Sequence, residues 1–181
     1  MRSNHGGEYI FTELNPVQWT FDNPPKVLVP IANGSEEMEA VIIIDILRRA
    51  KANVTVASVE DKLDIAAKQS YDLIVLPGGL GGAQAFANSV TLVNLLKRQR
   101  ESNRYYGAIC ASPDKKATAF PALSNKLSDK SEIENRVLID GNLITSRGPG
   151  TAMELALTIV EKFFGRKLGL ELAKAMVFTW P

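Results

Sequence analysis

Cys110, the single cysteine of the 181-residue chain, is the residue best suited to covalent chemistry. It follows the apolar run 105–109 and precedes Ala111-Ser112-Pro113, where the proline suits the first turn of a helix. A thiol at this point would lie near backbone amides and the positive end of a helix dipole, which lower its pKa and favour the thiolate. The position therefore indicates a nucleophile, and the alternative is a small buried hydrophobic residue.

Glu36, Glu37 and Glu39 lie in the first turn of a helix that we predict over residues 36–51, with Ser35 as its N-cap. The helix dipole favours carboxylates there, which suffices to explain the first two. Glu39 differs because it begins the inner face of the helix, on which three isoleucines follow. Its carboxyl would be partly buried, with a raised pKa, and could give or take a proton beside a thiolate.

A glycine-rich run, Gly78-Gly79-Leu80-Gly81-Gly82, follows the apolar segment 71–76. Glycines let backbone amides approach a ligand without hindrance from side chains. The run lacks the Lys-Ser/Thr pair and the full spacing of a phosphate-binding loop, so it favours an oxyanion site over a nucleotide site. Further along, Arg147 either binds an anion at a helix start or forms a structural salt bridge.

Strand-like and helix-like segments alternate from Lys26 onward, which is typical of an α/β protein with a parallel sheet. The pattern predicts strands over residues 27–32, 53–59, 71–76, 105–111 and 116–120. It predicts helices over residues 36–51, 64–68, 91–101, 151–163 and 168–176. Residues 136–139 and 143–145 are predicted to pair as a hairpin. Ligands bind beyond the carboxyl ends of parallel strands, so the residues named above should meet at one edge of the sheet.

Composition narrows the classes of function and the organisation of the chain. The formal net charge of +1 provides no large field for nucleic acid or an anionic membrane, and no apolar run approaches the roughly 20 residues of a membrane span. One cysteine excludes an internal disulfide, and the only histidine, His5, belongs to no metal-ligand pattern. We expect a soluble, intracellular protein without a signal peptide, with residues 1–25 as a linker or arm and residues 26–181 as one domain.

Four ordered segments resemble the ThiJ/PfpI superfamily, specifically the branch of the Parkinson-disease-linked deglycase (DJ-one). They are VPIANGSEEME (29–39), YDLIVLPGG (71–79), GAICA (107–111) and TSRGPGT (145–151). The resemblance implies a flavodoxin-like three-layer sandwich with a mostly parallel sheet and helices on both faces. Residues 8–15 also look like the interdomain linker of plant tandem members, which implies that the domain resembles their second half.

By this resemblance Cys110 is the nucleophile, Glu39 its acid/base partner, and the amides of Gly79 and Ala111 the oxyanion site. The implied activity is a glyoxalase or deglycase acting on methylglyoxal, glyoxal or their early protein and nucleotide adducts. It requires no cofactor and no metal. The implied partners are small aldehydes and a second copy or a paired tandem domain, and the implied compartment is the cytoplasm, with the nucleus and the plastid as further possibilities.

Three features of the chain depart from the pattern that the resemblance implies. The connections between Val59 and Asp72 and between Ala111 and Lys116 are short, and Phe120 stands where relatives often carry a histidine. Because a parallel crossover needs about a dozen residues, the second connection cannot hold the usual helix. Two alternatives to the enzyme therefore stay open: a cysteine-based sensor of oxidative stress or holdase chaperone, and a degenerate domain that only pairs with a partner.

Overall fold

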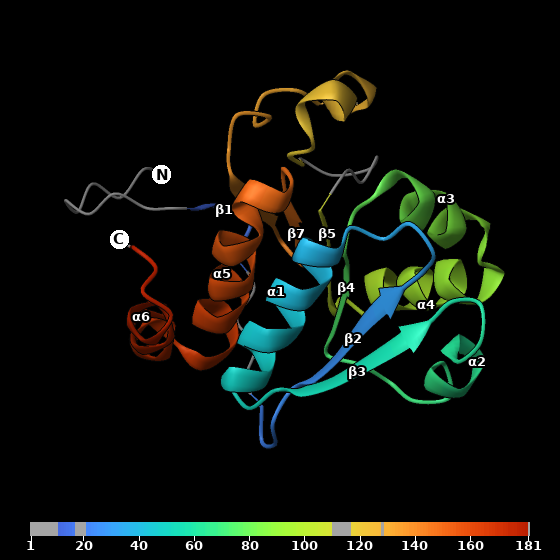
Figure 1. The fold of residues 1–181 in the computed structure, drawn as a ribbon, viewed down its shortest axis with the longest axis horizontal. Coiled ribbons are helices and arrows are strands. Elements are labelled where there is room, and N and C mark those ends of the chain that lie inside the picture. Colours follow the sequence, from blue (N-terminus) through green and yellow to red (C-terminus); the bar gives the residue numbers. More distant parts are fainter. Residues whose placement is uncertain (1–10, 17–20, 110–116, 128, 181) are drawn as a thin grey trace.

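The computed structural model describes residues 11–16, 21–109, 117–127 and 129–180 (Figure 1). Within these ranges the strands form one sheet in the order β1-β6-β7-β5-β4-β2-β3. Their bounds are Phe11–Leu14, Lys26–Ile31, Asn53–Ser58, Leu73–Leu76, Tyr105–Ile109, Val137–Asp140 and Leu143–Ser146 for β1 to β7. Neighbouring strands are parallel except β6 and β7, which are antiparallel, so the prediction of a mostly parallel α/β sheet is confirmed.

Helices cover both faces of the sheet, as Figure 1 shows. Their bounds are Glu37–Arg49, Leu63–Ala66, Leu80–Asn88, Val90–Glu101, Ala152–Phe164 and Arg166–Ala175 for α1 to α6. Side chains alternate across a strand, and in β2 Val27 and Val29 pack into the core with α1, α5 and α6, whereas Leu28 packs into the core with α2, α3 and α4. The three-layer sandwich is therefore confirmed.

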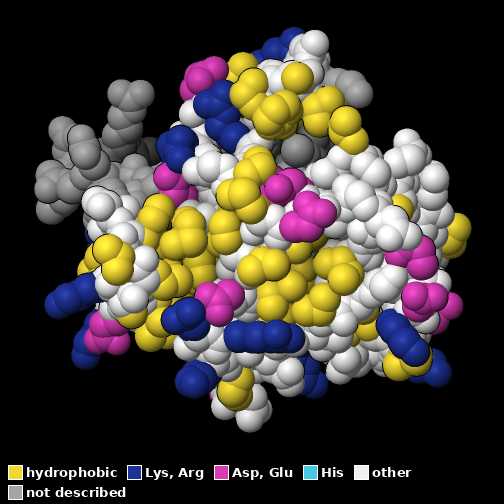
Figure 2. Space-filling model, viewed as in Figure 1, with side chains coloured by type: hydrophobic (Ala, Val, Ile, Leu, Met, Phe, Trp, Pro, Cys, Tyr) yellow, Lys and Arg dark blue, Asp and Glu magenta, His cyan; other side chains and the backbone are white. Residues whose placement is uncertain are grey.

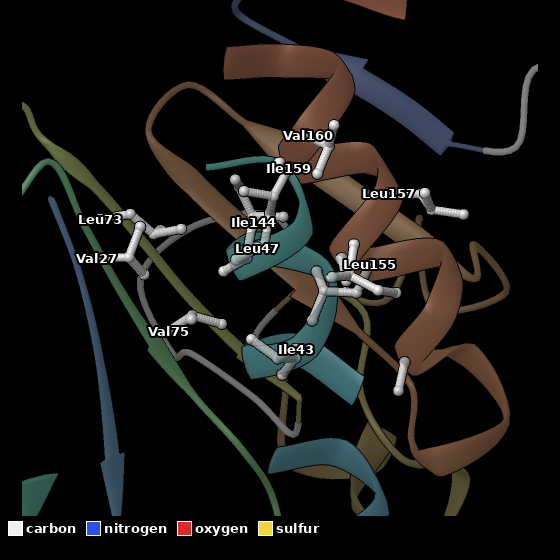
Figure 3. Close-up of a cluster of buried hydrophobic side chains, with 14 of the residues drawn as sticks. Val27, Ile43, Leu47, Leu73, Val75, Ile144, Leu155, Leu157, Ile159 and Val160 are labelled. Atoms are coloured by element: carbon white, nitrogen blue, oxygen red, sulfur yellow. The ribbon is translucent and has the colours of Figure 1, made fainter. Parts of the chain in front are cut away.

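The hydrophobic core between the sheet and helices α1, α5 and α6 holds α1 on the sheet. Ile43 and Leu47 of α1 are fully buried against Leu155 of α5 and against sheet residues such as Val75 (Figure 3). Full burial of an aliphatic side chain of this size contributes about 1.5–3 kcal/mol relative to exposure. Glu39 lies one turn before Ile43 on the same face, so the packing that holds the isoleucine also sets the direction of the carboxyl.

The start of α1 differs from the prediction in its capping residue. Glu36, not Ser35, is the N-cap, and its Oε2 accepts a hydrogen bond from Glu39 N at 2.7 Å. Ser35 Oγ instead accepts from Ala32 N at 3.0 Å, which closes the turn after β2. The serine was wrongly assigned because serine is a common N-cap, and here the turn uses its hydroxyl first.

Two further elements were wrongly predicted. The glycine-rich run does not stay a loop but opens helix α3, because Ala83 N donates to Gly79 O at 2.8 Å. Glycine lowers helix propensity, so the sequence concealed this helix. The predicted strand 116–120 is absent from its described part, 117–120, where Thr118 N donates at 3.1 Å to the side-chain hydroxyl of Thr145 and not to the backbone of a strand.

The hairpin of β6 and β7 is confirmed, with its turn one residue later than predicted. Its loop is Gly141-Asn142, and Gly141 has a φ of +61°, a conformation that glycine adopts without steric cost. Tight primed turns need a positive φ of this kind.

Residues 11–14 were expected to lack regular structure, yet they form the edge strand β1, parallel to β6. Lys162 of α5 forms an ion pair with Glu13, and the ring of Phe21 lies 5.1 Å from that of Phe163 between centroids. The segment was missed because a four-residue edge strand has too few positions to show a period. The division into an arm of residues 1–25 and a domain from Lys26 stays a prediction.

Candidate functional site

Glu39 is the chemically distinctive side chain of the site. It is 2% exposed, and its Oε2 accepts a hydrogen bond from Gly78 N at 2.5 Å. Removal from water raises its pKa from 4.5 to about 7, and the nearby Glu36 carboxylate adds to the rise, although the Gly78 N–H opposes it. A carboxyl with this pKa exchanges protons readily at neutral pH.

The raised pKa of Glu39 predicts that stability depends on pH. Because the folded protein favours the protonated carboxyl, its contribution is full below the unfolded pKa of 4.5 and is lost as pH rises to about 7. Between pH 5 and 8 we expect the free energy of unfolding to fall by roughly 2–3 kcal/mol from this group alone. Urea denaturation of the wild type and Glu39→Gln at each pH measures the difference, and parallel pH profiles would contradict the prediction.

Gly78 links Glu39 to the start of α1 and to the end of β5. Its N–H donates to the Glu39 carboxylate, and its carbonyl accepts from Glu36 N at 2.9 Å. A Cβ on Gly78 would lie 2.7 Å from Glu39 Oε2 and 3.0 Å from Ile109 O, the last carbonyl of β5. Only glycine therefore lets this peptide fit between the carboxyl and the end of the strand that leads to Cys110.

The predicted residues are brought together only in part within the described structure. Glu39 and Gly79 lie at the carboxyl edge of the sheet, as expected. Cys110 and Ala111 lie outside the described residues, so their roles stay predictions. The structure adds two groups to the predicted site, the Gly78 peptide and the side chain of Glu36, which caps α1. The sequence contained a signal for Glu36, because it precedes Glu39 by three residues, which is the spacing of a capping box.

Gly79 adopts a conformation that other residues rarely take, with a φ of +97°. It is the N-cap of α3, and its N–H donates to none of the residues that the structure describes. Its Cα faces the turn after β2, where an added Cβ would lie 2.2 Å from Gly34 O. The glycine thereby holds the start of α3 against the turn that precedes α1.

Arg147 forms a salt bridge, with its Nη1 3.2 Å from Glu134 Oε2, as the structural alternative for this residue predicted. It lines a cavity of about 210 Å³ together with Phe120, Arg136 and the segment 148–151. Phe120 packs closely on Gly148, since a Cβ there would lie 3.3 Å from the phenylalanine ring. The ring of Phe120 therefore forms part of the wall of this cavity, beside Gly148.

Metal and membrane features were searched over the described ranges. No group of three or more His, Cys, Asp and Glu side chains in this part of the chain could hold a metal ion. No helix described here has both the length and the apolar character needed to cross a membrane.

The sequence matches the DJ-1/PfpI family over residues 25–162. The chain belongs to this family. The Toxoplasma gondii structure titled "DJ-1, oxidized" superimposes with a TM-score of 0.82 at 34% identity, covering 86% of this chain and 100% of that one. The shared DJ-1/PfpI fold agrees with the arrangement of sheet and helices described above.

Two Arabidopsis thaliana proteins are similar over most of the chain. Protein DJ-1 homolog B is 60% identical and DJ-1 homolog A is 52% identical, each over 97% of this chain but only 46% and 52% of their own lengths. The chain therefore spans about half the length of these relatives. The Caenorhabditis elegans protein named glutathione-independent glyoxalase DJR-1.2 is 30% identical over 77% of this chain and 88% of its own.

The alignment with the two Arabidopsis relatives is longer than the chain itself, 202 positions against 181 residues. Both relatives therefore have residues within the aligned stretch for which this chain has no counterpart. This agrees with the short connections noted in the sequence.

Proposed function

We propose that the protein is a cofactor-independent glyoxalase or deglycase that uses Cys110 as its nucleophile. The observation that carries the proposal is the buried Glu39 carboxyl, with a pKa of about 7, held beside the end of β5 by the Gly78 peptide. Membership of the DJ-1/PfpI family supports it, as does the relative named glutathione-independent glyoxalase. The substrate class is methylglyoxal, glyoxal or their early adducts with proteins and nucleotides.

The reaction on methylglyoxal needs one nucleophile and one group that moves protons. The Cys110 thiolate adds to the aldehyde carbon and forms a hemithioacetal. Glu39 then removes the proton from that carbon to give an enediol and returns a proton to the neighbouring carbon, which leaves a thioester. Water cleaves the thioester to lactate and restores the thiol. The Gly79 and Ala111 amides would stabilise the oxyanions along this path.

Replacement of the nucleophile is the direct test of this function. Cys110→Ser is expected to lose lactate production from methylglyoxal without glutathione by at least about 10³-fold, because an alcohol is a far weaker nucleophile than a thiolate at neutral pH. Lactate measured enzymatically, beside circular dichroism of both proteins, checks the result. Unchanged lactate production in the serine variant would exclude Cys110 as the nucleophile.

A sensor function is the second candidate, favoured by the raised pKa of Glu39. A protonated Glu39 could donate a hydrogen bond to a Cys110 sulfinate and stabilise this oxidation state. The structure of the Toxoplasma gondii relative, described as oxidized DJ-1, supports this second candidate. A +32 Da adduct on Cys110 after mild peroxide, without aldehyde turnover, would favour the sensor.

A second copy of the chain is the partner we propose, seated on α1. Met38 and Val41 are 56% and 64% exposed, and Figure 2 shows hydrophobic side chains gathered over α1 and toward β3. Exposed apolar patches of this kind mark interaction surfaces. Val41→Glu is expected to convert a dimer to a monomer in light scattering. Ile65→Glu, on the exposed side of α2, is the matched control, and dimers of both variants would contradict this interface.

We propose the cytoplasm as the compartment, with the nucleus and the plastid as the other candidates. The single cysteine supports a reducing environment, because secreted domains commonly carry disulfides.

A further inference from the structure

A groove of about 740 Å³ lies at the amino ends of strands β4 and β5, at the opposite end of these strands from the candidate active site. It is lined by the segment between α2 and β4, residues 67–71, and by the second half of α4 with the turn that leads to β5. These segments precede the amino ends of two parallel strands, whereas Gly78 and Ile109 lie at the carboxyl ends of the same strands. The groove is therefore separate from the candidate active site, and its volume is typical of small-molecule sites.

Positive charge is concentrated in the groove. Lys68, Arg98 and Arg104 line it, against a single carboxylate, Glu101. Within the described ranges the side chains of Lys68 and Arg98 form no hydrogen bond or ion pair, and Arg104 Nη1 donates at 3.3 Å to the Tyr71 carbonyl. The formal charge of the whole chain is only +1, so the groove carries a local excess of positive charge.

The alternative role for these cations is to stabilise helix ends, but the carbonyls there already have donors. Arg98 O accepts from Ser102 N at 2.9 Å and from Ser102 Oγ at 2.6 Å, and Gln99 O accepts from Arg104 N at 2.9 Å. At the end of α2, Ala66 O accepts from the Tyr71 hydroxyl at 3.0 Å. Capping therefore does not require the lysine and arginine side chains, which face a cavity that a ligand could occupy.

We propose that this groove binds a phosphorylated small molecule, a phosphate monoester of nucleoside or sugar size. Arg98, Arg104 and Lys68 provide the charge-assisted hydrogen bonds that a phosphate dianion prefers. The groove is far larger than a phosphate group, and Leu95 and Ala67 are apolar lining residues available to the rest of the ligand. Ser70 and Gln69 add polar groups for its hydroxyls.

Amide chemical shifts measured by NMR on the full chain test the site with AMP, adenosine and inorganic phosphate as probes. We expect saturable shifts with AMP at residues 68–71 and 98–104, little effect of adenosine, and weaker binding of inorganic phosphate. The double variant Lys68→Gln/Arg98→Gln should weaken AMP binding by about tenfold or more, because two charge-assisted contacts are lost.

The control variant Lys97→Gln/Lys167→Gln removes the same net charge from exposed positions that do not line the groove, and it should change AMP affinity less than about twofold. The absence of a saturable shift with AMP up to about 10 mM would overturn the site. A Kd of that size corresponds to a binding free energy of only about −3 kcal/mol. Equal weakening in both double variants would also overturn it. Equal affinity for AMP and inorganic phosphate would overturn the assignment to an ester.

Discussion

Glu39→Gln is expected to lower the kcat for methylglyoxal by about 10²–10⁴-fold, the range that a general acid/base provides. Glutamine keeps the shape of the side chain, and its amide oxygen can still accept the Gly78 N–H that now lies 2.5 Å from Glu39 Oε2. It cannot take up or release the proton that a carboxyl with a pKa of about 7 exchanges at neutral pH. Lactate formation from methylglyoxal measures the loss.

Glu37→Gln is the matched control for this experiment. Glu37 lies in the same turn of α1 but is exposed to solvent. Its neutralisation removes one charge from the same helix end and should leave kcat within about twofold, because an exposed first-turn charge interacts only weakly with its surroundings. Equal losses of kcat in the two variants would exclude a specific proton transfer by Glu39.

Gly79→Ala is expected to reduce the free energy of unfolding by about 3 kcal/mol or more. A φ of +97° costs a non-glycine residue about 1–3 kcal/mol, and overpacking adds a similar amount. The new Cβ would lie 2.2 Å from Gly34 O and 2.7 Å from Glu36 N. Gly34 O accepts a hydrogen bond from Gly82 N at 3.0 Å, so a shift that relieves the clash also weakens the start of α3.

Urea denaturation measures this effect, with Gly150→Ala as the control. Gly150 is exposed, its φ lies outside the positive range, and an added Cβ would meet nothing within 4 Å. Its replacement should change the free energy of unfolding by no more than about 0.5 kcal/mol. If the two alanine variants proved equally stable, Gly79 would not hold the close contact between α3 and the turn before α1.

Local periodicity was enough to predict the elements that form the centre of the sheet. The run from β2 into α1 is readable because an apolar strand is followed by acids, an apolar face and basic residues in the last turn. The same face predicts the burial of Glu39, since Ile43 lies one turn later. The loop positions after β2, β4 and β5 follow from the parallel order of the strands.

Periodicity failed where a long-range contact overrides a local preference. Helix α3 contains two glycines in its first turn, and propensity alone argues against it. Those glycines allow close approach to the turn after β2, as shown by a Cβ on Gly82, which would lie 2.8 Å from Ser35 Oγ. Residues 117–120 have strand-like composition, but Thr118 N donates to the side-chain hydroxyl of Thr145, 27 residues away, instead of to a neighbouring strand.

The sequence by itself determined the α/β class, the inward direction of Glu39 and the position of Cys110 directly after a buried strand, because all three follow from the order and period of apolar residues. The tertiary structure decided what surrounds that carboxyl. Gly78 lies 39 residues from Glu39 along the chain, and no local pattern predicts that its peptide would donate to the carboxylate and accept from Glu36 N. The raised pKa of Glu39 depends on this enclosure, since burial is its largest cause and burial exists only once α1 packs on the sheet.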